Sequence, residues 1–236
     1  MPVTLKLATS LDGRIATITM DDGKVNALSV EMLAELNAAL DRAAADRAVV
    51  VLCGRPGIFS AGFDLNVLQA GGVPAVGMVR AGFELAHRLL SFPLPVVIAC
   101  GGHAIAMGAF LLLSGDYRVG AAGPFKLTAN EVALGITMPY AAVEILRQRL
   151  APAAFNRAVA LAEAFAPENA VESGFLDRVV PAAELSQVAL TVAEAMSTLD
   201  LDAHGASKLR AREATLASLR AAIDSDAAAL GDRVRG

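Results

Sequence analysis

Apolar and polar residues alternate at the start of the chain, as they do in half-buried strands. Residues 3–8 and 14–20 both alternate, and Asp12-Gly13 between them is a common hairpin turn. The next segment has a helical period, with Ser29 as a suitable N-cap. The chain is therefore predicted to begin with two paired strands and an amphipathic helix. The apolar stripe of this helix, which runs to about residue 44, consists of Met32, Leu33, Leu36 and Leu40.

Two short runs rich in valine, residues 48–53 and 96–100, are typical of strands buried on both faces of a parallel sheet. A turn follows the first run at 54–57, and helical stretches are predicted over about 74–91 and 108–114. Strands that alternate with crossover helices indicate an α/β fold with parallel pairing, in which ligands bind at the carboxyl ends of the strands. Short helices continue to about residue 200, and the remaining strands are predicted at residues 117–119 and 176–180.

From about residue 201 the chain is rich in alanine, carries charges at helical spacing and has no glycine between Gly205 and Gly231. This pattern predicts a long terminal helix. We therefore divide the chain into a core, residues 1–199, and a C-terminal helical oligomerisation region, residues 200–236. Self-association is expected because apolar positions of this helix need a partner surface. These positions are Leu209, Leu216, Leu219 and Ile223.

Composition restricts the class of protein. The 236 residues are 55% hydrophobic and 19% charged, which excludes intrinsic disorder. The formal net charge of −4 argues against a nucleic-acid partner, because binding to a phosphate backbone needs a basic face. Three histidines and two cysteines are too few for a zinc ribbon or a disulfide scaffold.

A mean hydropathy of +0.52 raises the question of a membrane span. The longest stretch without Asp, Glu, Lys or Arg covers residues 89–115, but two prolines and several glycines interrupt it, so no single transmembrane helix fits. Residues 1–20 lack the apolar run and the cleavage site of a signal peptide. We therefore expect a soluble, cytoplasmic protein with reduced thiols and no membrane partner.

Two loops of small residues follow the buried strands and are candidates for binding an oxyanion. Residues 57–65 read G-I-F-S-A-G-F-D-L, and residues 101–110 read G-G-H-A-I-A-M-G-A-F. One free backbone N–H from each loop could contact a single carbonyl oxygen and form an oxyanion hole. The alternatives are an ordinary turn in which Asp64 caps a helix, and tight packing of an apolar helix.

Glu131 is the third candidate. No other charged residue occurs between Lys126 and Glu144, and the neighbours of Glu131 are mostly apolar. Burial of this carboxylate would raise its pKa toward the range of a general base. The alternative is a solvated glutamate at the start of a helix.

Six segments of the chain form one recognisable set: KVNALS (24–29), GIFSAGFDL (57–65), PLPVVIACGGHAIAMG (93–108), GDYRVGA (115–121), NEVALGITMP (130–139) and ESGFLDRVVP (172–181). Together they resemble the crotonase superfamily of enoyl-CoA hydratases and isomerases, over about residues 9–180. The resemblance implies a crotonase-like spiral of ββα units, followed by a C-terminal helical region that builds a homotrimer or a dimer of trimers. It also implies an acyl-CoA substrate whose thioester enolate is stabilised by two backbone N–H groups.

The resemblance assigns roles to individual residues. The two oxyanion donors correspond to Phe63 and to Met107, where the family prefers glycine. Any residue other than proline still supplies an N–H at that position. The segment that binds coenzyme A corresponds to Val25, Asn26, Leu28 and Ala61.

The same resemblance favours one reaction. Hydratases of the family use two glutamates, but the earlier position is Phe110 here and only the later one, Glu131, is kept. That arrangement is similar to isomerases that shift a 3-enoyl thioester to a 2-enoyl thioester, as are the D-Y-R run and the K-x-x-x-R-E element at Lys208 to Glu213. The chemistry requires no metal or redox cofactor, because it consists of proton transfers. Coenzyme A is part of the substrate. The alternatives are an enoyl-CoA hydratase and a non-catalytic acyl-CoA binding protein.

Several other conspicuous residues are assigned to structure. His103 is expected to pack or to cap the backbone, and Cys53 and Cys100 to be free, inert thiols. The basic residues of the terminal helix are interpreted as a solvated face, with contact to a coenzyme A phosphate as the alternative. These basic residues are Lys208, Arg210 and Arg212.

Overall fold

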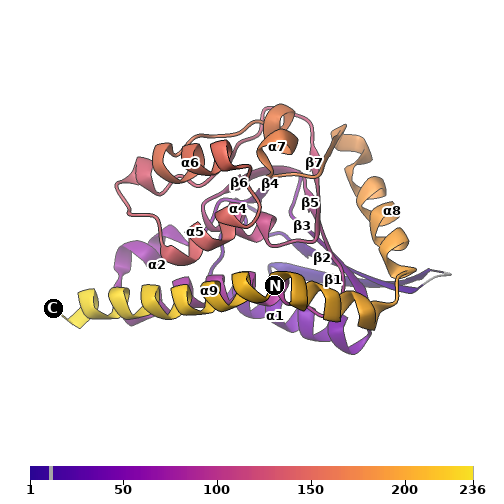
Figure 1. Cartoon of the computed structure of the whole chain (residues 1–236), viewed down its shortest axis with the longest axis horizontal. Helices are drawn as coiled ribbons and strands as arrows, with labels where there is room; N and C mark the ends of the chain where they lie inside the picture. Colours follow the sequence, from indigo (N-terminus) through magenta and orange to yellow (C-terminus); the bar gives the residue numbers. More distant parts are fainter. Residues whose placement is uncertain (11–12, 236) are drawn as a thin grey trace.

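A six-stranded sheet forms the centre of the chain in the computed structural model, which describes residues 1–10 and 13–235 (Figure 1). The strand order is β1-β2-β3-β5-β7-β9, and only the β1–β2 pair is antiparallel. The α/β class with parallel pairing is thus confirmed. The strands of this sheet are β1 (Val3–Ser10), β2 (Gly13–Met20), β3 (Val49–Cys53), β5 (Val96–Cys100), β7 (Tyr117–Ala121) and β9 (Arg178–Val180).

Helices fill most of the chain between the strands and after them. All predicted helices are present, and so is α2, which Asp64 caps as in the alternative interpretation of residues 57–65. The helices are α1 (Val30–Ala45), α2 (Leu65–Ala70), α3 (Gly72–Leu90), α4 (Met107–Leu113), α5 (Tyr140–Arg147), α6 (Pro152–Leu161), α7 (Pro167–Ser173), α8 (Leu185–Ser197) and α9 (Leu201–Arg235), with short 3-10 turns η1 (Val132–Leu134) and η2 (Ala182–Glu184).

The local signals at the start of the chain are confirmed. β1 and β2 pair from Val3 with Met20 to Ser10 with Gly13, as the alternating pattern predicted. The predicted turn residue Asp12 lies outside the described residues. The hydroxyl of Ser29 accepts a hydrogen bond from the N–H of Met32 at 3.1 Å and caps α1.

Alternate side chains of the central strands divide the apolar core into two parts. In β3, Val49 and Val51 face α8, whereas Val50 and Leu52 belong to the larger core under α1, α3, α4 and α5. Figure 1 shows α8 on one side of the sheet, with α4 and α5 on the other. Both faces are therefore covered, which explains why the predicted strands are continuous apolar runs.

A second, smaller sheet was not predicted. It consists of three parallel strands in the order β4-β6-β8: β4 (Gly57–Ser60), β6 (Gly102–Ile105) and β8 (Leu127–Thr128). The interpretation of 101–110 as a loop followed by a helix is therefore wrong at 102–105. These strands have only two to four residues and contain glycine, so no local pattern distinguishes them from loops.

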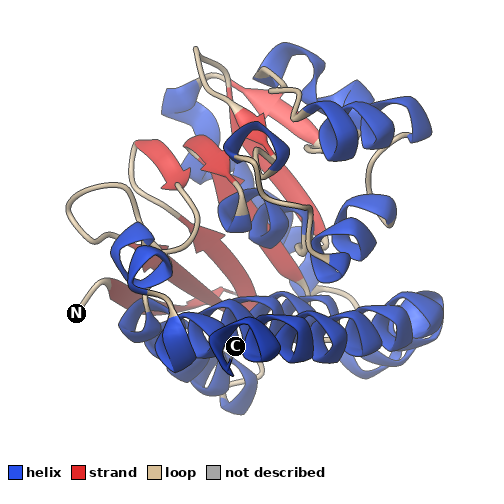
Figure 2. Ribbon diagram, turned by 90° about the vertical axis from the view of Figure 1, so that its left-hand side faces the viewer, coloured by secondary structure: helices blue, strands red, loops and turns tan. Residues whose placement is uncertain are grey.

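The terminal helix α9 runs along the edge of the molecule and packs against α3 and α5 of its own chain (Figures 1 and 2). Leu219 and Ile223 are 0% and 1% exposed, and Leu216 packs against the same core. The expectation that these positions need a partner surface is therefore wrong, because α3 and α5 cover them. Leu209 is 46% exposed, and the homotrimer remains a prediction. None of the described helices is long and apolar enough to cross a membrane.

Candidate active site

The three strands of the small sheet lead directly to the three residues predicted to carry the chemistry. Phe63 follows β4, Met107 follows β6 and Glu131 follows β8, each within three residues of the end of its strand. Because the strands are parallel, their carboxyl ends lie at one edge of the sheet, where ligands bind in such folds. The structure thus brings Phe63, Met107 and Glu131 to a common edge.

Backbone contacts connect the three loops at that edge. The N–H of Ala106 donates to the carbonyl of Thr128 at 2.9 Å, which ties the segment before Met107 to the segment before Glu131. Gly62 has a positive φ of 92°, and a Cβ there would lie 3.4 Å from the backbone nitrogen of Met107. The loop that carries Phe63 therefore lies against the start of α4.

Two N–H groups remain available at this point. Met107 is the first residue of α4, so its N–H has no partner within the helix. Among the residues that the structure describes, neither the Met107 N–H nor the Phe63 N–H has a hydrogen-bond acceptor. Two free donors on adjacent loops, one of them at the positive end of a helix, can stabilise negative charge on an oxygen atom.

A close approach between α4 and β4 sets the spacing of the two loops. A Cβ at position 108 would overlap the carbonyl oxygen of Ser60, so only glycine fits there. The Ser60 hydroxyl donates to the carbonyl of Asn26 at 2.7 Å and accepts from the N–H of Gly62 at 3.2 Å. Ser60 and Gly108 together fix the positions of Phe63 and Met107.

Three phenylalanine rings, one of them the side chain of the predicted donor Phe63, pack against one another. The Phe63 and Phe83 rings meet edge to face at 6.3 Å, and the Phe83 and Phe110 rings stack at 5.9 Å. Phe110, which occupies the position of the earlier hydratase glutamate, is 1% exposed. This part of the site is apolar and offers no group that could activate water.

Glu131 is a buried carboxylate. It is 8% exposed, and burial raises its pKa to about 7, although a hydrogen bond from its own backbone N–H acts in the opposite direction. Its Oε2 has no hydrogen-bond partner in the part of the chain that the structure describes. The prediction of a desolvated glutamate is confirmed, and the solvated alternative is wrong. A carboxylate with this pKa can exchange a proton near neutral pH.

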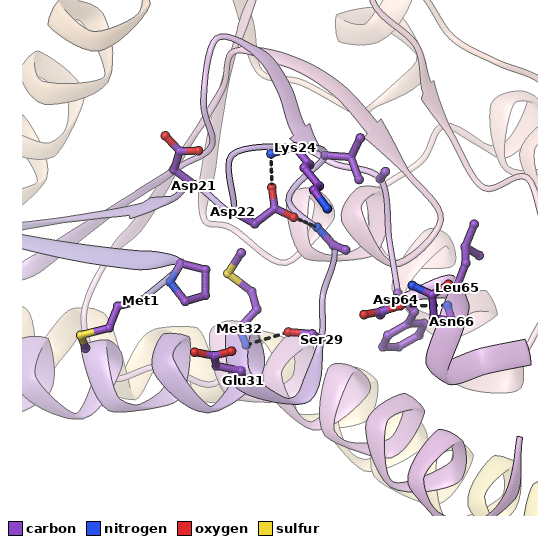
Figure 3. Close-up of a pocket in the computed structure, with 15 residues that line it drawn as sticks. Met1, Asp21, Asp22, Lys24, Ser29, Glu31, Met32, Asp64, Leu65 and Asn66 are labelled. Carbon is purple, nitrogen blue, oxygen red and sulfur yellow. Dashed lines mark hydrogen bonds between the residues drawn. The ribbon is translucent and has the colours of Figure 1, made fainter. Parts of the chain in front are cut away.

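An open cavity of about 690 Å³ lies beside the Phe63 loop (Figure 3). Val25, Ala61 and Phe63 line it, together with Lys24, which sequence reasoning did not single out. Carboxylates also line it, so its charge is mixed. Further lining residues are Asp21, Asp22, Glu31, Asp64, Leu65 and Asn66.

Two residues predicted to bind coenzyme A, Asn26 and Leu28, have wholly buried side chains. The Asn26 side chain donates to the carbonyls of Met20 and Phe59 at 3.0 and 3.1 Å, and the residue has a φ of 52°. The side chain of Asn26 therefore stabilises the conformation of the loop, and the neighbouring residue Val25 lines the cavity.

Asp22 stabilises the same loop through hydrogen bonds to its backbone. Its carboxylate accepts from the backbone N–H groups of Lys24, Asn26 and Ala27 at 2.7 to 2.9 Å. Burial alone would raise the pKa of Asp22, but these three hydrogen bonds and nearby Arg55 outweigh it and lower the pKa. Asp22 is thus ionised and engaged with the loop.

The residues assigned to structure behave as predicted, with one exception. His103 accepts from the N–H of Lys126 at 3.0 Å, and both cysteines are free. Burial raises the pKa of Cys100 to about 12, so this thiol is inert. No group of three or more His, Cys, Asp or Glu side chains among the described residues is placed to hold a metal ion.

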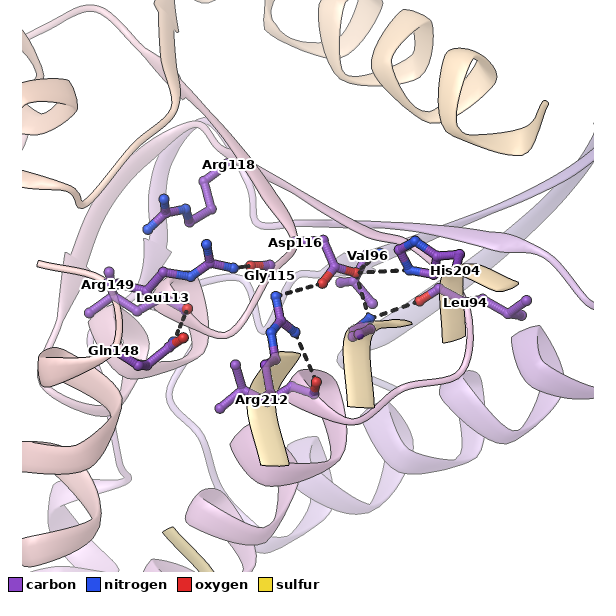
Figure 4. Close-up of polar contacts among 12 residues, drawn as sticks. Leu94, Val96, Leu113, Gly115, Asp116, Arg118, Gln148, Arg149, His204 and Arg212 are labelled. Carbon is purple, nitrogen blue, oxygen red and sulfur yellow. Dashed lines mark hydrogen bonds and ion pairs between the residues drawn. The ribbon is translucent and has the colours of Figure 1, made fainter. Parts of the chain in front are cut away.

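The exception is the basic face of α9. Lys208 and Arg212 are not solvated, because both bind the carboxylate of Asp116, at 2.6 and 2.8 Å (Figure 4). The interpretation of these two residues as a solvated face is therefore wrong, whereas Arg210 is exposed. The D-Y-R run and the K-x-x-x-R element thus form one ionic cluster, in which Asp116 of the first motif binds Lys208 and Arg212 of the second. Arg118 of the same run pairs with Asp177 at 2.8 Å.

Comparison with known proteins agrees with this geometry. The family model for enoyl-CoA hydratase/isomerase matches residues 11–232. The chain is 33% identical over 218 residues to human mitochondrial enoyl-CoA delta isomerase 1, covering 90% of this chain and 72% of that protein.

Two solved structures are similar over nearly their whole length. An enoyl-CoA hydratase from Mycobacterium marinum superposes with a TM-score of 0.91 at 49% identity, covering 98% of this chain and 100% of that chain. The apo structure of a Mycobacterium tuberculosis enoyl-CoA isomerase gives 0.91 at 48% identity, covering 96% and 98%. Relatives with both names are equally similar, so similarity alone does not select between the two reactions.

Proposed function

Because the chain belongs to the enoyl-CoA hydratase/isomerase family, we propose that it isomerises 3-enoyl-CoA thioesters to 2-enoyl-CoA thioesters. The observation that carries this proposal is a single buried carboxylate, Glu131, at the edge where the free N–H groups of Phe63 and Met107 also lie. One acid/base group and two oxyanion donors are the minimum that a double-bond shift needs.

The proposed mechanism moves one proton within the substrate. The Glu131 carboxylate removes a proton from C2, and the electron pair spreads over the thioester as a dienolate. The N–H groups of Phe63 and Met107 stabilise the charge on the thioester oxygen, each by about 2.7–4 kcal/mol. The Glu131 carboxyl then returns the proton to C4, which leaves the double bond between C2 and C3. The sequence of steps balances without a metal or a redox cofactor.

Hydration would need a second acid/base group that holds water against C3. Phe110 occupies the position from which the resemblance would supply it, and this ring is stacked on Phe83. An apolar ring can neither activate water nor donate a proton. The site therefore favours isomerisation over hydration.

We propose that the coenzyme A part of the substrate occupies the cavity beside Val25 and Ala61 (Figure 3). Lys24 supplies a cation for a phosphate group, and Ala61 offers its backbone carbonyl, since its N–H donates to the carbonyl of Val25 at 3.0 Å. The thioester would then reach the Phe63 N–H, since Phe63 lines the same cavity.

The test is a paired measurement on Glu131→Gln. This change keeps size and hydrogen bonding but removes the proton-accepting carboxylate. We expect the isomerase rate with a 3-enoyl-CoA to fall by about 10⁴-fold or more, because one group performs both proton transfers. Calorimetric affinity for a saturated acyl-CoA should be retained. The matched control is Glu144→Gln, whose carboxylate lies 3.6 Å from Arg147 and should be dispensable.

Three other outcomes would contradict the proposal. A Glu131→Gln enzyme that still isomerises at nearly the wild-type rate would place the base elsewhere. Turnover of crotonyl-CoA by hydration, in the ordinary range of about 1–1000 per second, would identify a hydratase. Tight acyl-CoA binding without turnover in the wild type would identify a non-catalytic binding protein.

A further inference from the structure

We propose that Asp226 on α9 is a positioning residue for Glu131, because it fixes the far end of the loop that carries this carboxylate. The inference rests on the proposed function only in so far as Glu131 is the base. Asp226 belongs to the D-S-D run near the end of the chain, and its carboxylate contacts the first turn of α5.

The contact replaces a helix cap that the local sequence cannot provide. The residue at the N-cap of α5 is Pro139, which has no side-chain acceptor for the first N–H groups of the helix. The two carboxylate oxygens of Asp226 accept from the N–H groups of Tyr140 and Ala141, at 3.1 and 2.9 Å. A carboxylate is also favoured at the positive end of a helix. A residue 85 positions away in the sequence thus performs the task of an N-cap.

Besides its two ends, the loop between β8 and α5 is held by the packing of η1 against α6 and by the buried side chain of Met138. Its start is held by the hydrogen bond from Ala106 to Thr128, and Glu131 is buried close to that end. Residues 132–137 are all exposed. The carbonyl of Glu131 accepts from the N–H groups of Leu134 and Ile136, which are bonds within the loop itself. The loop that carries Glu131 is therefore held by apolar packing of η1 and Met138 and by hydrogen bonds at its two ends, and Asp226 supplies the hydrogen bonds at the second end.

The surroundings of Glu131 provide a direct readout of its position. Its pKa is raised by burial, and no charged group contributes to the shift. Helix α6 packs against η1, and its charged side chain, Arg157, is paired with Glu163 at 2.7 Å. On α5, Glu144 and Arg147 pair with each other. Loosening the loop would admit water, and the pKa of Glu131 would then fall toward the ordinary value of a glutamate.

The experiment compares three substitutions in the full-length protein. Asp226→Ala removes both hydrogen bonds, and Asp226→Asn keeps one acceptor oxygen. Asp224→Ala is the matched control, since it removes a contact between α9 and α3, the 2.9 Å ion pair with Arg80, without touching α5. The pKa of Glu131 is followed by NMR of ¹³C-labelled glutamate carboxyls, and its signal is identified by its absence in Glu131→Gln. Values of kcat, KM and their pH profiles are measured on the same variants.

In Asp226→Ala we expect the pKa of Glu131 to fall by about one or more, so that the acid limb of kcat/KM moves to lower pH. The kcat value should fall by about 10- to 100-fold with little change in KM, because a small displacement of a catalytic group lowers the rate of the chemical step. Asp226→Asn should be intermediate, and Asp224→Ala should match the wild type.

Unchanged kcat and an unchanged Glu131 pKa in folded Asp226→Ala would overturn the inference. An equal effect of Asp224→Ala would also overturn it, because loosening of α9 in general would then be the cause. If Asp226→Ala fails to fold, the kcat value and the Glu131 pKa of Asp226→Asn test the inference instead, and unchanged values of both would overturn it. The NMR titration needs no turnover, so it tests the positioning role even if the wild type proves inactive and the proposed function fails.

Discussion

At the scale of single residues, burial of Glu131 links the proposed base to the stability of the fold. The pKa of Glu131 is raised from the ordinary 4.5 to about 7 by desolvation. Between these pH values the folded protein binds more protons at Glu131 than the unfolded chain does. The stability of the fold therefore falls as pH rises through this window.

The consequence is a gain in stability when the charge is removed. At pH 8 the difference between the two pKa values corresponds to roughly 3 kcal/mol, which sets the upper limit of the effect. We expect Glu131→Gln to unfold at higher urea concentration than the wild type at pH 8, and the advantage to disappear near pH 4. Glu194→Gln, a change at an exposed carboxylate on α8, is the control and should show no such difference. Equal midpoints of Glu131→Gln and wild type at pH 8 would contradict the prediction.

The burial of Glu131 was predictable from the sequence, but the reason for it was not. Its apolar neighbours suggested a desolvated site, yet Val132, Leu134 and Ile136 are 42% to 61% exposed. Tertiary packing buries the carboxylate instead. In the same way, the motif around Asn26 identified a loop beside the cavity of about 690 Å³, but the Asn26 side chain is buried inside this loop and bonds to the backbone.

At the scale of elements, the close approach of α4 and β4 fixes the spacing of the two predicted oxyanion donors. We expect Gly108→Ala to push α4 away from Ser60, because the new Cβ would overlap a backbone carbonyl. The displacement should lower kcat/KM by about 100-fold, the scale expected when a catalytic group moves by about 1 Å. Activity with a 3-enoyl-CoA and thermal unfolding are the measurements.

Gly77→Ala is the matched control for that change. Gly77 is also helical, in α3, but a Cβ there meets nothing within 4 Å. Alanine is favoured over glycine in a helix by about 1 kcal/mol, so this variant should be at least as stable and fully active. Equal activity of Gly108→Ala and Gly77→Ala would show that α4 can move without consequence.

Most elements of the large sheet could be predicted because their signals are local. Valine-rich runs identified β3 and β5, and the caps at Ser29 and Asp64 act within three residues of themselves. The small sheet β4-β6-β8 has no such signal, since its strands are short and pair with one another across long stretches of the chain. The predicted site residues follow these strands, so the motifs identified the residues while the sheet that gathers them went unrecognised.

At the scale of the whole molecule, α9 belongs to the core of its own chain. A helix that exposes its lysines and arginines to solvent and a helix that buries them in an ion cluster have the same sequence pattern. The difference here is Asp116, whose carboxylate lies 92 residues before Lys208 and is brought to it by the fold. The sequence therefore predicted the helix correctly but assigned its basic residues to solvent.

This cluster should make Asp116 a major determinant of stability. Its carboxylate accepts from Lys208, from Arg212 and from the backbone N–H of Val96, at 2.6 to 2.8 Å (Figure 4). Burial lowers the pKa of nearby Arg149 to about 10, and Arg118 and Arg212 lower it further. Without Asp116, Lys208 and Arg212 would lose their carboxylate partner, and Asp177, which pairs with Arg118, would be left to compensate the charge of Arg149. Removing one partner of a buried ion pair typically destabilises a protein by about 3–5 kcal/mol.

We therefore expect Asp116→Asn to lower the free energy of unfolding by about 3–5 kcal/mol, measured by urea denaturation at pH 7. Asp202→Asn is the matched control, because Asp202 is also on α9 and pairs with Arg47 at 2.9 Å, but both side chains are exposed. That change should cost about 1 kcal/mol or less, since water screens a surface pair. Similar losses in the two variants would mean that Asp116 is no more than a surface contact. A loss confined to Asp116→Asn would show that buried charge attaches the terminal helix to the sheet.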